Sequence, residues 1–178
     1  MDSAPGIWSS VRAAVAALGA ADPTPAQLRA MVGPPLQDGF AQVLGVPPAD
    51  VPRAVAAYRA HYSAGALLDV TVHDGVPDLL GALRVAGAVL AVATSKPETF
   101  AVRVLEHTGL LPAFAGVHGA TLDGAVRHKE QVVAAALAAH PDGLRPVLVG
   151  DRAQDVLGGG NAVTGSAYGM SPPVCTSP

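Results

Sequence analysis

Residues 88–97 give the strongest indication of the fold of this chain; they read Ala-Val-Leu-Ala-Val-Ala-Thr-Ser-Lys-Pro. Its first six residues, 88–93, are all apolar and follow Gly87, a residue that interrupts regular structure. A short apolar run with β-branched residues predicts a strand buried on both faces, as in a parallel sheet. Pro97 favours the first turn of a helix, which we predict to run through about His107.

A second apolar run predicts another buried strand at residues 146–150, Pro-Val-Leu-Val-Gly. It is followed by Asp151 and by a predicted helix. Between the two runs, the sequence predicts a brief strand near residues 116–118 and a helix over about residues 128–139. Strands that alternate with helices predict an α/β fold with a parallel sheet and right-handed crossovers.

The first third of the chain carries helix signals and no strand signal. Apolar residues between Ile7 and Leu18 recur on one face of a helix. Residues 24–27, Thr-Pro-Ala-Gln, have the form of a capping box with proline at the first helical position. Asp50 is placed to cap a helix that runs through about Tyr62. We therefore expect a block of helices ahead of the α/β part.

Helix signals cover roughly residues 7–66, and the alternating strand and helix signals of the α/β part follow them. The remaining residues, 161–178, are rich in Ser, Pro and Gly and low in strand signal. We expect this last segment to be a poorly ordered or aberrant tail.

Composition and charge exclude several classes of function. The chain has 178 residues, of which 50% are hydrophobic, and a formal net charge of −3. A general binder of nucleic acid polymers or of anionic membranes would carry a basic surplus instead. No stretch approaches the roughly 18 apolar residues of a membrane span, and the N-terminus lacks the basic residues of a signal peptide. We expect a cytoplasmic protein, and its one cysteine, Cys175, excludes an internal disulfide.

Three polar groups fall near strand ends, where the ligands of an open parallel sheet bind. Thr94 and Ser95 offer hydroxyl groups beside a helix N-terminus, which favours an anion. Asp151 and Asp155 stand four residues apart, so both carboxylates can face one Mg²⁺. Lys129, near the start of another helix, can bridge a phosphate and a carboxylate. The plainer alternatives are helix capping by Ser95 or Asp151 and solvation of the other charged groups.

In this order along the chain, the three groups resemble motifs two, three and four of the haloacid dehalogenase-like hydrolase superfamily. The resemblance runs from the first residue to about Gly158. It is similar to the branch that contains phosphoglycolate phosphatases and 5′-nucleotidase-like enzymes. The segments that carry it are residues 93–97, 122–124, 128–129 and 150–155, and residues 32–36, which resemble part of that branch's helical cap.

The resemblance implies a Rossmann-like parallel core made of residues 1–7 and 71–160, with an α-helical cap inserted over residues 8–70. It also implies Mg²⁺-dependent hydrolysis of a phosphate monoester through an aspartyl-phosphate. Thr94 or Ser95 would hold the phosphate, and Lys129 would stabilise its charge. Asp151 would contact Mg²⁺, with Asp155 as a direct or water-mediated partner.

The resemblance further implies that the cap helps to select the substrate. Gly33, Pro34 and Pro35 are the cap residues expected at the site, and the partner would be a small phosphorylated metabolite. A non-catalytic protein that binds phosphate or Mg²⁺ is the alternative function. A 2-haloacid dehalogenase is the third possibility, disfavoured because that reaction needs no pair of Mg²⁺ ligands.

The first motif of the family, Asp-x-Asp-Gly-Thr at the end of the first strand, has no counterpart in this sequence. The 178 residues contain no Asp-x-Asp, and Asp2 corresponds to the Asp-Ser that often trails the motif. We therefore expect a core without its first, central strand and a chain that is inactive as written. A mis-assigned start codon or a gene fragment would explain this. The sequence after Asp155, at the C-terminal edge of the expected sheet, is also atypical of the family. An early end or a frameshift would explain this.

Overall fold

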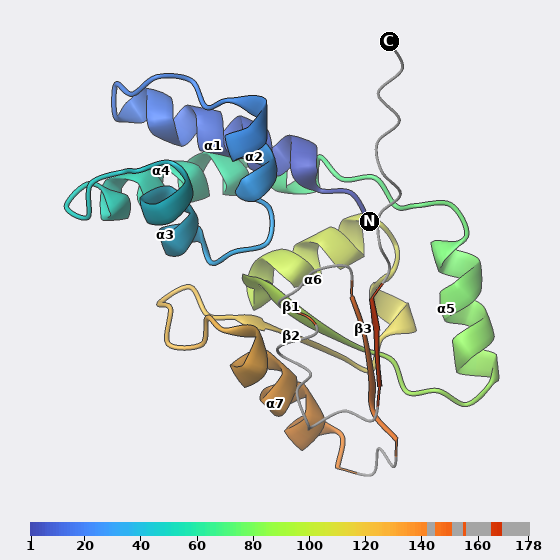
Figure 1. Ribbon diagram of the computed structural model, residues 1–178. Helices are drawn as coiled ribbons and strands as arrows, with labels where there is room; N and C mark the ends of the chain where they lie inside the picture. The colour runs from blue at the N-terminus through green and yellow to red at the C-terminus, as the bar shows by residue number, and fades with distance from the viewer. Residues whose placement is uncertain (142–144, 151–154, 156–164, 169–178) are drawn as a thin grey trace.

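The computed structural model describes residues 1–141, 145–150, 155 and 165–168 (Figure 1). A block of helices is followed by an α/β part, in the order that the sequence predicts. The helices are α1 (Ala4–Ala17), α2 (Pro25–Ala30), α3 (Leu36–Asp38), α4 (Val51–Ala64), α5 (Val76–Val85), α6 (Glu98–His107) and α7 (Lys129–Ala139). The strands are β1 (Ala91–Pro97), β2 (Gly116–Ala120), β3 (Val147–Gly150) and β4 (Gly165–Tyr168). Short single turns are η1 (Gly39–Val43), η2 (Ala66–Leu68) and η3 (Leu111–Ala113).

The helical block packs around its own hydrophobic core, with α1 and α4 side by side (Figure 1). Val11, Phe40 and Leu67 are fully buried there, and each such side chain contributes about 1.5–3 kcal/mol by leaving water. Gly6 allows α1 to approach η2 closely, because a Cβ at that position would overlap the carbonyl oxygen of Ala66. Val104 of α6 joins this core, so the block and the α/β part share buried contacts.

The expected helix caps are partly as predicted. The backbone N–H of Gln27 donates to Thr24 Oγ1 (3.3 Å) and that of Thr24 donates to Gln27 Oε1 (2.9 Å), so the capping box is confirmed. Asp50 precedes α4 but makes no side-chain cap. Its carboxylate instead accepts a 3.4 Å bond from Arg53, so the predicted capping by Asp50 is wrong.

The first pair of strands is parallel, as predicted, but β1 lies further along the chain than expected. The predicted strand covered residues 88–93, whereas β1 runs from Ala91 to Pro97. Pairing with β2 sets this position, in a register that runs from Ala91 opposite Gly116 to Pro97 opposite Ala120. The site hydroxyls of Thr94 and Ser95 therefore lie within the end of the strand, while α6 and α7 both pack against this pair.

The second pair, β3 and β4, is also parallel, and among the described residues it shares no ladder with the first pair. The α/β class with parallel strands is confirmed. The side chains of Val147 and Val149 on β3 are 61% and 75% exposed. Buried parallel strands are normally covered on both faces, whereas these two side chains of β3 are exposed.

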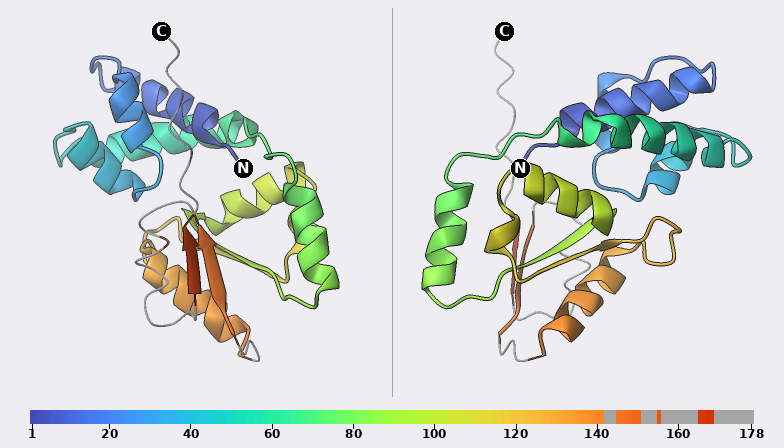
Figure 2. Two further views of the ribbon diagram at one scale, coloured as in Figure 1. Left: turned by 45° about the vertical axis from the view of Figure 1, so that its right-hand side comes forward. Right: turned by 180° about the vertical axis from the view of Figure 1, so that it is seen from behind.

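Within the expected tail, residues 165–168 form β4, although Gly-Ser-Ala-Tyr has little strand signal. The expectation of a poorly ordered or aberrant tail stays a prediction. The rest of residues 161–178 lies outside the described residues, and the boundaries predicted for cap and core remain predictions. In the views of Figure 1 and Figure 2, the helical block lies over one end of the sheet, beside α6. No helix in the described part of the chain is long and apolar enough to cross a membrane.

Candidate active site

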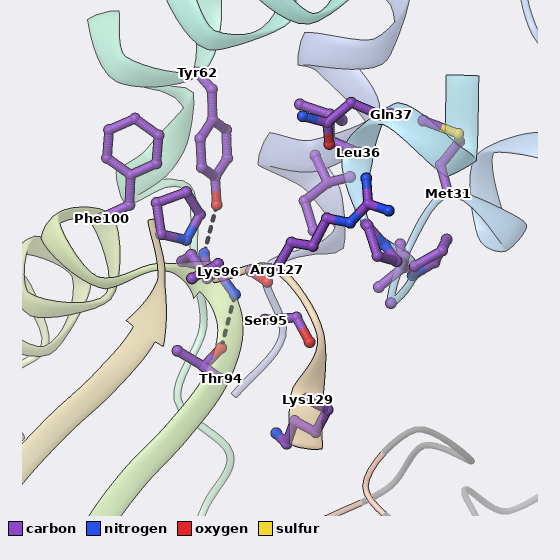
Figure 3. A pocket seen from close by; sticks show the side chains of 18 of the residues that line it. Met31, Leu36, Gln37, Tyr62, Thr94, Ser95, Lys96, Phe100, Arg127 and Lys129 are labelled. Atoms are coloured by element: carbon purple, nitrogen blue, oxygen red, sulfur yellow. Dashed lines mark hydrogen bonds between the residues drawn. The ribbon is translucent and has the colours of Figure 1, made fainter. Parts of the chain in front are cut away.

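A pocket of about 430 Å³ lies between the helical block and the carboxyl ends of β1 and β3 (Figure 3). This volume is within the range of small-molecule sites, about 300–1,000 Å³. Segments far apart in the sequence meet here, as expected for the ends of parallel strands. The pocket is lined by every expected site residue that the structure describes: Gly33, Pro34, Pro35, Thr94, Ser95, Lys129 and Asp155.

Lys129 is the best-anchored charge in the pocket. Its side chain is 11% exposed, and its Nζ donates to the carbonyl oxygen of Ala93 (2.5 Å) at the end of β1. The same Nζ pairs with Asp155 Oδ1 at 2.8 Å. The alternative of a solvated lysine is therefore wrong, and the predicted contact with a carboxylate is present. Its contact with phosphate stays a prediction.

The two hydroxyl residues differ in their contacts. Thr94 Oγ1 accepts a bond from the backbone N–H of Lys96 (3.1 Å). Ser95 makes no hydrogen bond through its hydroxyl within the described residues. The residue that precedes α6 is Pro97, which carries no side-chain cap, so capping by Ser95 is wrong. The Ser95 hydroxyl is thus available to a ligand at the start of α6.

Asp155 is the one predicted metal ligand whose position is described, since Asp151 lies outside the described residues. The Asp155 side chain is 15% exposed and lies against Gly150 at the end of β3. A Cβ at position 150 would overlap this carboxylate, so glycine makes room for it. A carboxylate oxygen is the ligand type that Mg²⁺ prefers. The described residues alone contain no group of three potential metal ligands, so the fit to Mg²⁺ rests on Asp155.

The cap contributes a rigid loop to the pocket. Gly33 has φ of 121°, a left-handed conformation that favours glycine. Pro34 and Pro35 follow and fix the chain direction into α3. Met31, which packs against Gly39 at the base of this loop, also lines the pocket. The loop lies where a cap residue could contact a substrate, and its role in selection stays a prediction.

Sequence reasoning missed the contact between Lys96 and Tyr62. Lys96 Nζ donates to the Tyr62 hydroxyl (2.5 Å) and lies 5.1 Å from the ring centroid. Burial lowers the pKa of Lys96 to about 8 and raises the pKa of Tyr62 to about 12. The Tyr62 ring stacks on Tyr58 and meets Phe100 edge-on. The available signal was that the chain has two lysines, Lys96 and Lys129, and both lie in the pocket.

Arg127 is a second residue that the motifs did not single out. It follows a turn in which Asp123 Oδ1 accepts from the Thr121 hydroxyl (2.5 Å) and the Ala125 backbone N–H (3.0 Å). These bonds hold the pKa of Asp123 below its usual value. The turn brings Arg127 to the pocket, with its side chain directed toward Leu36 of the cap (Figure 3).

The geometry is that of an α/β protein with a ligand pocket at its strand ends and a helical cap above it. The sequence matches the family model described as haloacid dehalogenase-like hydrolase over residues 1–167. The chain belongs to this family, and the resemblance drawn from its motifs is confirmed.

Three curated relatives are similar to most of this chain and carry different names. A 5′-nucleotidase of Pseudomonas aeruginosa is 38% identical over 95% of this chain and 78% of its own length. The tyrosine-protein kinase PtkA of Mycobacterium tuberculosis is 41% identical over 96% of this chain and 60% of its own length. A phosphoglycolate phosphatase of Agrobacterium fabrum is 31% identical over 93% of this chain and 74% of its own length. The chain therefore spans between 60% and 78% of these relatives.

Solved structures agree with this assignment. PtkA from Mycobacterium tuberculosis aligns with a TM-score of 0.82 at 38% identity, covering 99% of this chain and 83% of that chain. A predicted phosphatase from Clostridium acetobutylicum aligns with a TM-score of 0.81 at 32% identity, covering 88% and 73%. The described fold is thus that of the family, with a helix-rich part and a parallel sheet.

Proposed function

We propose that this chain forms the phosphate-binding and substrate-selecting part of a Mg²⁺-dependent phosphate-monoester hydrolase. The observation that carries the proposal is Lys129, a buried cation held between Ala93 and Asp155 at the end of the sheet. Beside it lies Ser95, whose hydroxyl has no partner among the described residues. A cation and a free donor at the start of a helix form a site for a phosphate group.

Each residue has a distinct part in this proposal. Thr94 or Ser95 donates to the phosphate oxygens, and Lys129 compensates the charge that grows on them during transfer. Asp155, together with Asp151, would hold Mg²⁺, which supplies further neutralisation of the phosphoryl charge. Lys129 also keeps Asp155 oriented, because the two side chains are already paired at 2.8 Å.

The nucleophile is where this sequence departs from its family. The resemblance implies attack by the first Asp of an Asp-x-Asp motif, and these 178 residues contain no such motif. We expect a polypeptide of these residues to bind phosphate with little or no turnover, because loss of a nucleophile removes many orders of magnitude in rate. A second candidate, a non-catalytic protein that binds phosphate and Mg²⁺, rests on the same site residues.

The proposed ligand is a small phosphorylated metabolite. Relatives named 5′-nucleotidase and phosphoglycolate phosphatase support this class of substrate. A cytoplasmic location and the absence of nucleic acid or membrane partners belong to the same proposal. They are supported by the net charge of −3, since a polyanion binder would carry a basic surplus.

Calorimetric titration of inorganic phosphate in the presence of Mg²⁺ tests the proposal. Ser95→Ala should weaken phosphate binding several-fold, and Lys129→Met should weaken it by about tenfold or more, because a charge-assisted bond is lost. Arg84→Gln, a change on the exposed end of α5, is the matched control and should leave binding unchanged.

Release of phosphate from p-nitrophenyl phosphate, measured on the same sample, separates the two candidates. Phosphate binding without turnover favours the non-catalytic candidate, and turnover that falls with Lys129→Met favours the enzyme. Absence of phosphate binding in the folded protein would contradict both. Lys129→Arg, which keeps the charge, is the second variant in case Lys129→Met fails to fold.

A further inference from the structure

The pocket has a surplus of positive charge that one phosphate does not explain. Among the described residues, it is lined by four cationic side chains and one carboxylate, Asp155, although the whole chain has a net charge of −3. Among the described residues, Lys129 is the only one of the four that pairs with a carboxylate. The three cations left over are Arg59, Lys96 and Arg127.

Three of the four cations fall into two groups, one at the sheet end and one toward the cap. Lys129 lies at the sheet end, with Thr94 and Ser95, where the phosphate is proposed to bind (Figure 3). Lys96 and Arg127 lie toward the cap, next to Tyr62 and Leu36 respectively (Figure 3). A phosphate at the sheet end would leave this second group without an anion.

We propose that Lys96 and Arg127 form a second anion subsite, and that the ligand is a phosphorylated metabolite with a further oxyanion, either a carboxylate or a second phosphate. The inference rests on the proposed function, because it assigns the other end of the same ligand. It adds the requirement that the ligand carries a second anionic group.

Lys96 has the donors for such a subsite. An ammonium group has three N–H donors, and one of them goes to the Tyr62 hydroxyl. No other partner of this group exists among the described residues. Burial of the uncompensated charge lowers the pKa of Lys96 to about 8, and a bound anion would supply the missing compensation. Tyr62, which accepts from Lys96, keeps its own proton for a further bond.

Arg127 adds a different kind of recognition. Arg127 is exposed, and its side chain is paired with no carboxylate among the described residues; its Nε lies 3.1 Å from His128 Nε2. A guanidinium group binds carboxylate or phosphate through two parallel bonds, which a single ammonium cannot do. Arg127 comes from the core and Tyr62 from α4 of the cap, so an anion between them would contact both parts of the molecule.

Three phosphonates that cannot be hydrolysed test the inference by calorimetry with Mg²⁺ present. Methylphosphonate carries one anionic group, phosphonoacetate adds a carboxylate, and methylenediphosphonate adds a second phosphoryl group. We expect at least one of the two larger ligands to bind about tenfold tighter than methylphosphonate. Whichever gains more identifies the second oxyanion as carboxylate or phosphate.

Variants then assign the preference to the subsite. Lys96→Met and Arg127→Gln should each lower the ratio of the affinity for the larger ligand to that for methylphosphonate toward one, while methylphosphonate binding itself changes little. Arg84→Gln should leave this ratio unchanged. Arg127 is exposed, so its variant tests the inference even where Lys96→Met lowers the melting temperature. Equal binding of all three ligands, or a preference that survives both variants, would overturn the subsite but not the phosphate site. Absence of binding by all three would overturn the proposed function as well.

Discussion

The helical block and the sheet of this molecule differ in how completely they bury their apolar side chains. In the block, Phe40 and Leu67 are fully buried and the helices close around them. In the sheet, Val147 and Val149 of β3 are largely exposed, and β1–β2 and β3–β4 are two separate pairs within the described residues. Helices complete their backbone hydrogen bonds locally, whereas a strand needs neighbours on both sides.

The two regions also contribute different groups to the pocket. The helical block contributes the loop at residues 33–35 and the Tyr62 side chain, both next to its hydrophobic core. The sheet contributes the charged end of the pocket, where Lys129 and Asp155 lie beside the ends of β1 and β3. The part of the molecule with the weaker packing therefore holds the groups proposed to bind phosphate.

The largest expected effect breaks the core of the block. Phe40→Ala should lower the free energy of unfolding by about 3–5 kcal/mol, because a fully buried ring is lost and a cavity remains. Val147→Thr on β3 should change it by less than about 0.5 kcal/mol, since that side chain is already 61% exposed. Urea unfolding of both variants gives the two values. Similar losses for both would contradict the contrast between block and sheet.

A second prediction concerns the contact that joins the two regions. Burial lowers the pKa of Lys96 to about 8 from an ordinary value of 10.5. Between these values the unfolded chain binds a proton that the folded chain does not, so stability rises with pH. From pH 8 to pH 10, the stability of the wild type relative to Lys96→Met should rise by about 2 kcal/mol. Unfolding at several pH values checks this, and a flat difference would show that Lys96 titrates normally.

A smaller effect is expected at the end of β3. Gly150→Ala places a Cβ where the Asp155 carboxylate lies, so it should displace that side chain from Lys129. We expect about tenfold weaker phosphate binding with Mg²⁺ present, as for other changes that misorient a ligand. Gly81→Ala on α5 is the matched control, because nothing surrounds that position. It should leave binding intact and add about 0.5–1 kcal/mol of stability; unchanged binding in Gly150→Ala would contradict the role of Gly150.

Local features of the helices could be predicted from the sequence, whereas the positions of the strands depend on their pairing. The capping box at Thr24 and Gln27 was predictable because its bonds are local. The strand β1 was predicted about three residues too early, because the apolar run begins before pairing with β2 does, and Val89 is in fact 70% exposed. The strand β4 was missed because its pairing with β3, and not its composition, makes it a strand.

The site shows the same division. Residues with a motif, such as Ser95, Lys129 and Asp155, could be assigned to one site from the sequence, since strand ends meet in a parallel sheet. The contact between Lys96 and Tyr62 joins residues 34 positions apart, on a strand and a helix of different layers. No periodicity or spacing signals such a pair, because it depends on how the helical block lies over the sheet.

A crystal structure of the protein with phosphate and Mg²⁺ tests most directly whether Ser95 and Lys129 bind the phosphate. We predict a phosphate within hydrogen-bond distance of the Ser95 hydroxyl and Lys129 Nζ, with Asp155 on the side away from the cap. A phosphate bound elsewhere on the folded chain, with no contact to Lys129 or Ser95, would contradict the proposed site.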